Sequence, residues 1–122
     1  EKNIYALDLG PFTTDSVDYP DYAAKIAEYI KDNPQALGVL ICGTGVGISI
    51  AANRYPHIRA GIAYNFDIAK LIREHNDANV IVFGARFMEE NFAWNCLQVF
   101  MNTPFEGGRH EKRINKLLPR QF

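Results

Sequence analysis

The chain is poor in the residues that build metal centres and disulfide frameworks. Its 122 residues include only two cysteines and three histidines. Cys42 and Cys96 are far apart in the sequence and no CxxC pair occurs, so neither a zinc ligand set nor a disulfide framework is indicated. We therefore expect no metal site, and two unpaired cysteines fit a reducing, cytoplasmic setting.

Long apolar runs and a strong net charge are also missing. The longest apolar stretches have about five or six residues, far fewer than a membrane span needs, and no charged and then hydrophobic leader opens the sequence. The formal net charge is −1 and the pI is near 6.3, so the chain lacks the positive field that sequence-independent nucleic-acid binding requires. We expect neither a membrane nor a nucleic acid as a partner.

The composition is that of an ordinary globular protein, with 48% hydrophobic residues and nine glycines. No repeat, linker or low-complexity stretch divides the chain. A chain of this length buries roughly 65% of its unfolded surface, so its core needs no disulfide or metal. We expect one domain over residues 1–122.

Short apolar runs alternate with helical patterns along the sequence. The runs typical of strands are Ile4–Leu7, Leu37–Ile41, Ile58–Tyr64 and Val80–Phe83. Helices are predicted where Ala23, Ile26, Ala27 and Ile30 share a face, and over Ile48–Arg54, Phe66–Glu74, Glu89–Met101 and Arg109–Leu118. Pro20 suits a first helical turn and Asn65 an N-cap. This order predicts an α/β fold, a three-layer Rossmann-like parallel sheet with helices on both faces.

Ligands of such sheets bind at the carboxyl ends of the strands. There, Cys42-Gly43-Thr44-Gly45-Val46-Gly47 joins an apolar strand to an apolar helix. Glycines let the backbone turn sharply and aim its N–H groups at one point, and a helix N-terminus adds partial positive charge. The segment is either an anion or oxyanion site or simply a tight turn. It is not a dinucleotide fingerprint, because its third glycine falls one position early, and no Gly-Lys-Ser/Thr follows as in a P-loop.

Cys42 stands at the mouth of this loop, where the helix dipole favours the thiolate. It is a candidate base or nucleophile, or else a packing residue. Cys96 lies inside an apolar helical stretch and is expected in the core. Thr44 could present its hydroxyl to the same pocket or cap the following helix.

Two other polar clusters are candidates for chemistry. His75 follows a predicted helix, where it either satisfies the last carbonyls or acts as a general acid near neutral pH. Arg109 and Arg113 share a helix face in a basic C-terminal segment, which suits phosphate but is also typical of a solvated face. Arg86, just after a strand, is a further anion candidate, and His57 most simply lies at the surface.

Together these clusters carry a resemblance. Residues 42–53 (CGTGVGISIAAN), 75–80 (HNDANV) and 105–110 (FEGGRH) resemble segments of the type B ribose-5-phosphate isomerases, the family that includes the galactose-6-phosphate isomerase subunits. Residues 15–21 also resemble that family's loop after its second strand. The resemblance runs from about Ile4 to Leu118.

The resemblance implies an isomerase without metal or cofactor that interconverts D-ribose 5-phosphate and D-ribulose 5-phosphate through an enediolate, in the pentose phosphate pathway. Cys42 matches the proton acceptor, His75 the acid that opens the sugar ring, and Asn76 a substrate contact. The amides of Gly43, Thr44, Gly45, Val46 and Gly47 match the anion hole, and Arg109 and Arg113 match phosphate ligands. Tyr19 and Thr44 match pocket residues, and the resemblance implies a catalytic role for Thr44 as well.

The sequence departs from the family at its start. Family members begin with a strand ending in an Asp-His pair and a first helix, about two dozen residues at ordinary element lengths, whereas this sequence starts at what resembles the second strand. We expect that segment to have been left out, because a parallel strand without its neighbour leaves unpaired backbone and an open apolar face.

The family is dimeric or tetrameric with pockets across a subunit interface, so the resemblance implies a homo-oligomer. The aromatic-rich residues 87–101 would serve as core or as interface. Alternative functions are isomerisation of a six-carbon sugar phosphate, such as galactose 6-phosphate or allose 6-phosphate, and non-catalytic phosphate binding. A nucleotide-binding domain is disfavoured by the glycine spacing.

Overall fold

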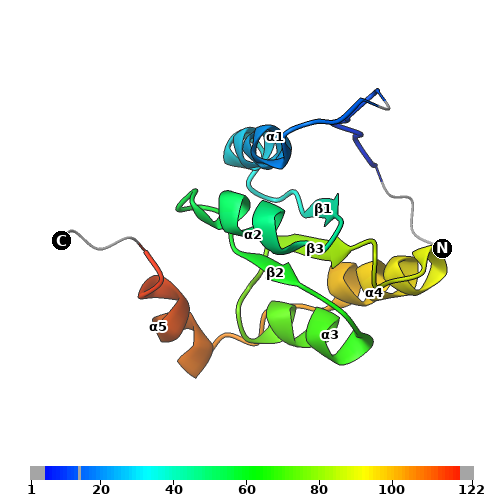
Figure 1. Cartoon of the computed structure of the whole chain (residues 1–122). Helices are drawn as coiled ribbons and strands as arrows, with labels where there is room; N and C mark the ends of the chain where they lie inside the picture. Colours follow the sequence, from blue (N-terminus) through cyan, green and yellow to red (C-terminus); the bar gives the residue numbers. More distant parts are fainter. Residues whose placement is uncertain (1–4, 14, 119–122) are drawn as a thin grey trace.

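The computed structural model describes residues 5–13 and 15–118. Within them the helices are α1 (Tyr19–Asp32), α2 (Val46–Asn53), α3 (Phe66–Glu74), α4 (Glu90–Asn102) and α5 (Arg109–Asn115), and the strands are β1 (Gly38–Cys42), β2 (Ala60–Ile62) and β3 (Val80–Gly84). The strands form one parallel sheet in the order β1-β3-β2. Figure 1 shows the helices on the two faces of this sheet, with α5 set apart from the others.

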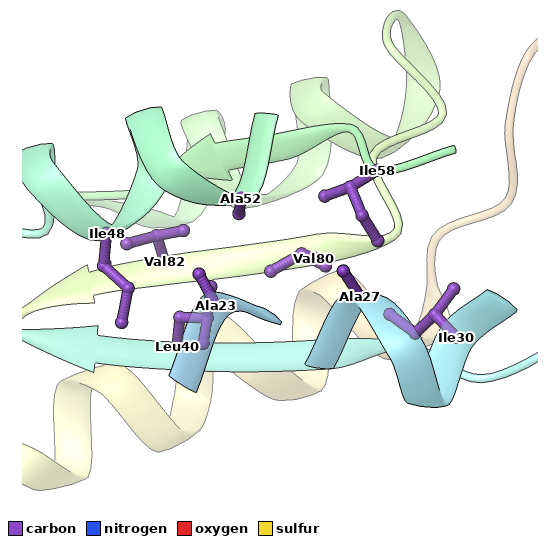
Figure 2. Close-up of a cluster of buried hydrophobic side chains, with 9 residues drawn as sticks. All are labelled: Ala23, Ala27, Ile30, Leu40, Ile48, Ala52, Ile58, Val80 and Val82. Carbon is purple, nitrogen blue, oxygen red and sulfur yellow. The ribbon is translucent and has the colours of Figure 1, made fainter. Parts of the chain in front are cut away.

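The central strand β3 is buried along its whole length and separates two apolar cores. Val80 and Val82 face the core shared with α1 and α2 (Figure 2). Ile81 and Phe83 face the core shared with α3 and α4. Because successive side chains of a strand point to opposite faces, one strand supplies both cores. The predicted three-layer α/β architecture is confirmed.

Small residues bring the helices close to the first face of the sheet. Ala23 and Ala27 stand four apart on α1 and Ala52 lies on α2, and all three are fully buried. In Figure 2 they surround the aliphatic side chains of β1 and β3. A larger side chain at these positions would push the helices outward, because such interiors are close-packed.

Most predicted elements are confirmed to within a few residues. Phe66–Glu74 forms α3, and Asn65 caps it by accepting from the Ile68 N–H at 2.9 Å. Pro20 lies in the first turn of α1, and Cys96 is fully buried. None of the helices in the described part of the chain has the length and hydropathy that crossing a bilayer requires.

The predicted strand Ile4–Leu7 is wrong over residues 5–7, and Ile4 lies outside the described residues. Tyr5 is 83% exposed and Leu7 52% exposed, so this stretch buries no apolar face. A strand needs a neighbour for its backbone hydrogen bonds. Among the described residues, none pairs with this stretch as a strand.

Two other predicted elements are shorter than expected. Of Ile58–Tyr64 only Ala60–Ile62 is strand, because the Ile58 N–H donates to Tyr55 in a turn at 2.9 Å. The predicted helix Arg109–Leu118 ends at Asn115. Beyond it the backbone N–H groups of residues 116 and 117 bond three residues back, which is the tightening typical of a helix end.

Strand β1 has a free edge within the described residues. It pairs with β3 on one side, and no described strand pairs with its other side. On β1, Leu40 is buried while Val39 and Ile41 are 36% and 64% exposed. The sheet therefore presents unpaired backbone and an open apolar face at β1.

We predict that Phe100→Ala lowers the free energy of unfolding by about 3–5 kcal/mol, because the fully buried ring would leave a cavity between α4 and the sheet. Phe87→Ala is the matched control: that ring is 68% exposed, and its loss should change stability by no more than about 0.5 kcal/mol. Urea unfolding followed by circular dichroism measures both. Equal losses would contradict the placement of the second core.

Candidate active site

Residues 42–47, here called the glycine loop, connect β1 to α2 at the carboxyl end of the sheet. Gly45 is the N-cap of α2 and has a φ of 83°, a left-handed conformation that glycine adopts without steric cost. The chain therefore turns directly from strand into helix. The first N–H groups of α2, which have no partner within the helix, point back toward the loop.

Hydrogen bonds tie the carbonyl groups of the glycine loop to neighbouring segments. The carbonyls of Cys42, Gly43 and Thr44 accept in turn from the Ala85 N–H at 2.8 Å, the Arg86 N–H at 3.0 Å and the Tyr64 hydroxyl at 3.3 Å. In a planar trans peptide, the N–H that follows a carbonyl points the opposite way. The next three N–H groups are thus directed away from these partners, as an anion site requires.

Close contacts at two glycines set the position of the loop. A Cβ at Gly84 would lie 2.5 Å from the Thr44 carbonyl oxygen, so the loop rests on the end of β3 only because this residue is glycine. A Cβ at Gly47 would lie 2.7 Å from Cζ of Tyr19. The Tyr19 ring therefore packs against the first turn of α2, beside the other predicted pocket residues.

Two predicted pocket groups bond to each other. The Thr44 hydroxyl oxygen accepts from the Val46 N–H at 3.1 Å, a contact within the loop, whereas the N-cap position of α2 is Gly45 and has no side-chain cap. The Val46 amide is thereby engaged inside the loop rather than directed at an anion.

The two cysteines differ in burial. Cys42, at the start of the glycine loop, is partly buried, and Cys96 is buried. Burial raises the pKa of the Cys96 thiol, as expected for an inert core cysteine.

Arg86 also reaches the glycine loop. A Cβ at Gly43 would lie 3.1 Å from Nε of Arg86, so the guanidinium group lies over the start of the loop. Arg86 is exposed. The sequence-based suggestion of an anion-binding role at this position is therefore compatible with where the side chain lies.

A second cluster lies at the other end of the sheet. Six residues line a pocket of about 240 Å³, here called the His75 pocket: His75, Asn76, His110, Arg113, Ile114 and Leu117. It brings together the predicted acid, a predicted substrate contact and one predicted phosphate ligand. Arg109 is exposed at the start of α5 and does not line the pocket.

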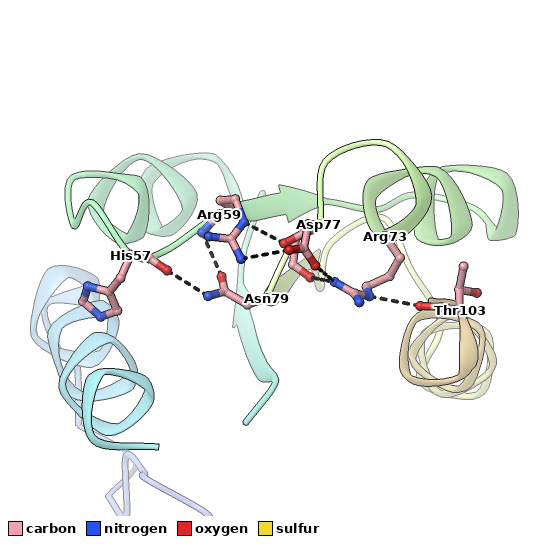
Figure 3. A network of polar contacts seen from close by, with 7 residues as sticks. His57, Arg59, Arg73, Asp77, Asn79 and Thr103 are labelled. Carbon is pink, nitrogen blue, oxygen red and sulfur yellow. Dashed lines mark hydrogen bonds and ion pairs between the residues drawn. The ribbon is translucent and has the colours of Figure 1, made fainter. Parts of the chain in front are cut away.

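A polar network holds the turn that follows His75 (Figure 3). Asp77 has a φ of 45°, and its carboxylate pairs with Arg73 Nη1 at 2.8 Å and Arg59 Nη2 at 3.5 Å. The Asp77 carbonyl accepts from Arg59 Nε at 2.7 Å, and Arg73 Nε donates to the Thr103 carbonyl at 3.1 Å. The two arginines thus fix the turn to β2 and to the end of α4.

The same network corrects the interpretation of His57. Its Nε2 lies 2.7 Å from the Ala27 carbonyl, and its own carbonyl accepts from Asn79 Nδ2 at 2.8 Å. His57 is therefore a partly buried link between α1 and the turn before β3, not a free surface residue.

Two neighbours of His75 had no predicted role. The His110 ring stacks on the His75 ring, with centroids 4.3 Å apart and planes 15° apart. Glu106 Oε1 lies 3.4 Å from His110 Nε2. Glu106 lies in the non-helical stretch before α5, so helical spacing in the sequence does not signal this contact.

Within one chain, the glycine loop and the His75 pocket are separate. Cys42 pairs with Gly84 at the carboxyl end of the sheet, whereas His75 precedes β3 at the amino end. A five-residue strand spans about 13 Å between its first and last Cα atoms. The structure therefore does not bring the predicted base and the predicted acid together in one copy.

Comparison with known protein families finds a match over residues 1–117 to the model described as Ribose/Galactose Isomerase. The chain is 38% identical over 117 residues to ribose-5-phosphate isomerase B of Escherichia coli, and the aligned region covers 96% of this chain and 78% of that protein. It is 43% identical over 121 residues to a probable ribose-5-phosphate isomerase B of Mycoplasma pneumoniae, covering 97% and 78%.

Solved structures give the same result. The ribose 5-phosphate isomerase of Thermotoga maritima superposes with a TM-score of 0.88 at 48% identity, over 91% of this chain and 77% of that one. Ribose-5-phosphate isomerase B of Mycoplasma genitalium with bound ribulose-5-phosphate has a TM-score of 0.87 at 41% identity, over 91% and 74%.

We predict that Asp77→Ala lowers the free energy of unfolding by about 1–3 kcal/mol, because it leaves the largely buried Arg73 without its carboxylate partner. Glu74→Ala is the control: Glu74 pairs with the exposed Lys70 at 3.9 Å, and its loss should cost no more than about 0.5 kcal/mol. Chemical denaturation measures both. An Asp77 variant as stable as the Glu74 variant would show that the network does not hold this turn.

Proposed function

Because the chain belongs to the ribose/galactose isomerase family, we propose that it interconverts D-ribose 5-phosphate and D-ribulose 5-phosphate. The observation that carries this function is the glycine loop, which begins at Cys42 and whose carbonyls are hydrogen-bonded to neighbouring segments. Relatives named ribose-5-phosphate isomerase B, one with bound ribulose-5-phosphate, support the choice of substrate.

The reaction needs a base and a site for a developing oxyanion. The hydrogen on C2 of the open-chain aldose is weakly acidic, so stabilising the enediolate matters more than the strength of the base. Cys42 as thiolate removes this proton and returns it to C1, while the hydroxyl proton on O2 moves to O1. The loop N–H groups and the N-terminus of α2 stabilise the negative charge on the enediolate oxygen.

The His75 pocket supplies the remaining functions. His75 opens the furanose ring by protonating the ring oxygen, which an imidazole does near neutral pH. Arg113 binds the phosphate, and Arg109 on the same short helix adds positive charge. Because the phosphate is remote from C1 and C2, its binding energy positions the reacting carbons against the base.

The complete active site forms between two copies of the chain. Cys42 and His75 lie at opposite ends of one sheet, farther apart than a five-carbon chain reaches. In a two-fold dimer, the interface contacts repeat twice. The His75 pocket of one copy then faces the glycine loop of the other, and two equivalent sites form.

Exposed apolar side chains around the glycine loop support this assembly. Val46 and Ile50 stand four apart on α2 and are 47% and 54% exposed, so they form one apolar stripe on that helix. Tyr64 and Phe66, just after β2, are 45% and 43% exposed. Clusters of this kind mark association surfaces, and a homo-oligomer would bury them.

The free edge of β1 supports a second proposal, which concerns the sheet. One further parallel strand pairs with β1, and a helix behind it covers Val39 and Ile41. Unpaired backbone and an open apolar face are the features that such a strand and helix remove. Residues 1–122 then form most of a single sugar-phosphate isomerase domain.

The chemistry also favours a reducing compartment such as the cytoplasm. Both cysteines are unpaired within the structure. A base that works as a thiolate is inactivated by oxidation or disulfide formation, and reducing compartments prevent both.

We predict that the protein converts ribose 5-phosphate to ribulose 5-phosphate and that Cys42→Ala lowers kcat by about 10²–10⁴-fold, the usual contribution of a positioned base. Sugar-phosphate binding should persist, because the loop amides and Arg113 remain. The assay follows ribulose 5-phosphate formation, with exchange of the C2 hydrogen into solvent as a second readout.

Cys96→Ala is the matched control, since Cys96 is buried away from the loop and its loss should leave kcat close to that of the parent protein. Galactose 6-phosphate and allose 6-phosphate are assayed in parallel. If only a hexose phosphate is turned over, the substrate is a six-carbon sugar phosphate and not ribose 5-phosphate. Sugar-phosphate binding without C2 exchange would identify a binding protein, and a fully active Cys42→Ala variant would exclude the thiolate mechanism.

A mixing experiment tests the shared site. Cys42→Ala and His75→Ala are each expected to be inactive, and equal amounts unfolded together and refolded should recover about a quarter of parental activity. Random pairing makes half of the dimers mixed, and each mixed dimer holds one intact site of two. Two inactive variants that stay inactive as confirmed mixed dimers would show that both residues act within one copy.

A further inference from the structure

Glu106 is anchored beside His75 although the two residues belong to different segments. The Glu106 N–H donates to the Glu74 carbonyl at 3.1 Å, which ties the stretch before α5 to the end of α3. His110, four residues after Glu106, then stacks its ring on that of His75. Three side chains that ligate metals are thus brought together at one end of the His75 pocket.

His110 has a polar atom without a satisfied partner. The residue is 5% exposed, and its Nε2 makes no hydrogen bond within the described structure. Glu106 Oε1 lies 3.4 Å from it. A buried ring nitrogen normally finds a partner, so this atom, close to the carboxylate but not hydrogen-bonded to it, marks a place where a further group can bind.

We propose that His75, Glu106 and His110 bind a divalent transition-metal ion of the Zn²⁺ type. One ligand atom from each residue lies within 4.8 Å of the other two. Two imidazoles and one carboxylate form a ligand set that zinc takes when a fourth position stays open to water or another ligand. No described residue outside these three is needed for the site.

The distances require only a small adjustment. At zinc–ligand distances of about 2.0–2.2 Å, neighbouring ligand atoms of a tetrahedral ion lie about 3.4 Å apart. Glu106 and His110 already have this separation. His75 is partly buried and the Glu106 side chain is 51% exposed, so both can turn toward the ion. The two rings would leave their parallel stack as they do so.

Nearby charge limits the affinity. Arg113 lines the same pocket, and its guanidinium repels a divalent cation, whereas Glu106 attracts it. We therefore expect a dissociation constant in the micromolar range, and tighter binding after Arg113→Ala. This dependence on Arg113 separates a site in the pocket from adventitious binding elsewhere.

Occupation of the site would regulate activity, a consequence that rests on the proposed function. A His75 nitrogen bound to a metal ion cannot hold the proton that opens the sugar ring. Zinc should therefore inhibit isomerisation, with half-inhibition near the dissociation constant. The ion is an inhibitor in this scheme and has no part in catalysis.

The first test measures Zn²⁺ binding to the whole chain, by calorimetry and by competition with a chromophoric chelator. One ion per chain is expected. Glu106→Gln, which keeps shape and removes the carboxylate, should weaken binding at least tenfold, and His110→Gln likewise. Glu111→Gln is the matched control, because this exposed acid on α5 lies outside the cluster.

A second experiment uses Cys42→Ala, because the thiol of Cys42 is partly exposed and can itself bind zinc. If binding survives in this variant and is lost in Glu106→Gln, the proposed site holds the ion. If binding is lost with Cys42, is unaffected by Glu106→Gln, or is absent up to millimolar zinc, the proposal is wrong. Because Glu106 is half exposed, its variant decides the question even if His110→Gln fails to fold.

Inhibition is measured separately. Zinc should inhibit the parent protein and should inhibit Glu106→Gln at least tenfold less at the same concentration. A protein that binds zinc at these residues but shows no isomerase activity would refute the proposed function and leave the metal site standing. A protein that isomerises ribose 5-phosphate but does not bind zinc would refute the metal site and leave the proposed function standing.

Discussion

Both halves of the proposed site depend on the complete burial of β3. At its carboxyl end, Gly84 lets the Thr44 carbonyl approach the strand, and this contact sets the glycine loop. At its amino end, the Asn79 carbonyl accepts from Gly38 at 2.8 Å, and the Asn79 N–H donates to Arg59 at 3.0 Å. Because close-packed cores cover both faces of β3, the two ends cannot shift independently, and each half-site keeps its geometry.

The parts that were predictable from sequence are local in the chain. The alternation of apolar runs with helical patterns predicted the layers, and the glycine spacing predicted a sharp strand-to-helix turn, which Gly45 makes with its positive φ. Asn65 was recognisable as a cap because its partner is only three residues away. Such signals survive folding because the atoms involved are held together by the chain itself.

The parts that were not predictable depend on contacts between distant segments. Residues 5–7 have a strand-like composition but no strand beside them in the described structure, so composition alone predicted wrongly. The stacking of His110 on His75 and the packing of Tyr19 on Gly47 join residues about thirty positions apart. Likewise, Cys42 and His75 are separated because one follows a strand at the carboxyl end of the sheet and the other precedes a strand at the amino end. Recognising polar loops in the sequence does not by itself show at which end of the sheet each loop lies.

This separation has a physical consequence for catalysis. In a single copy, the glycine loop faces water, where hydrogen bonds to a developing oxyanion are weakened by the high dielectric constant. In the proposed dimer, a second copy that covers the loop would exclude water and bring His75 and Arg113 to the substrate, so the loop N–H groups without a partner in the loop would stabilise the enediolate more strongly. The proposed dimer therefore couples assembly to catalysis: the contact that would complete the set of residues would also lower the polarity in which they act.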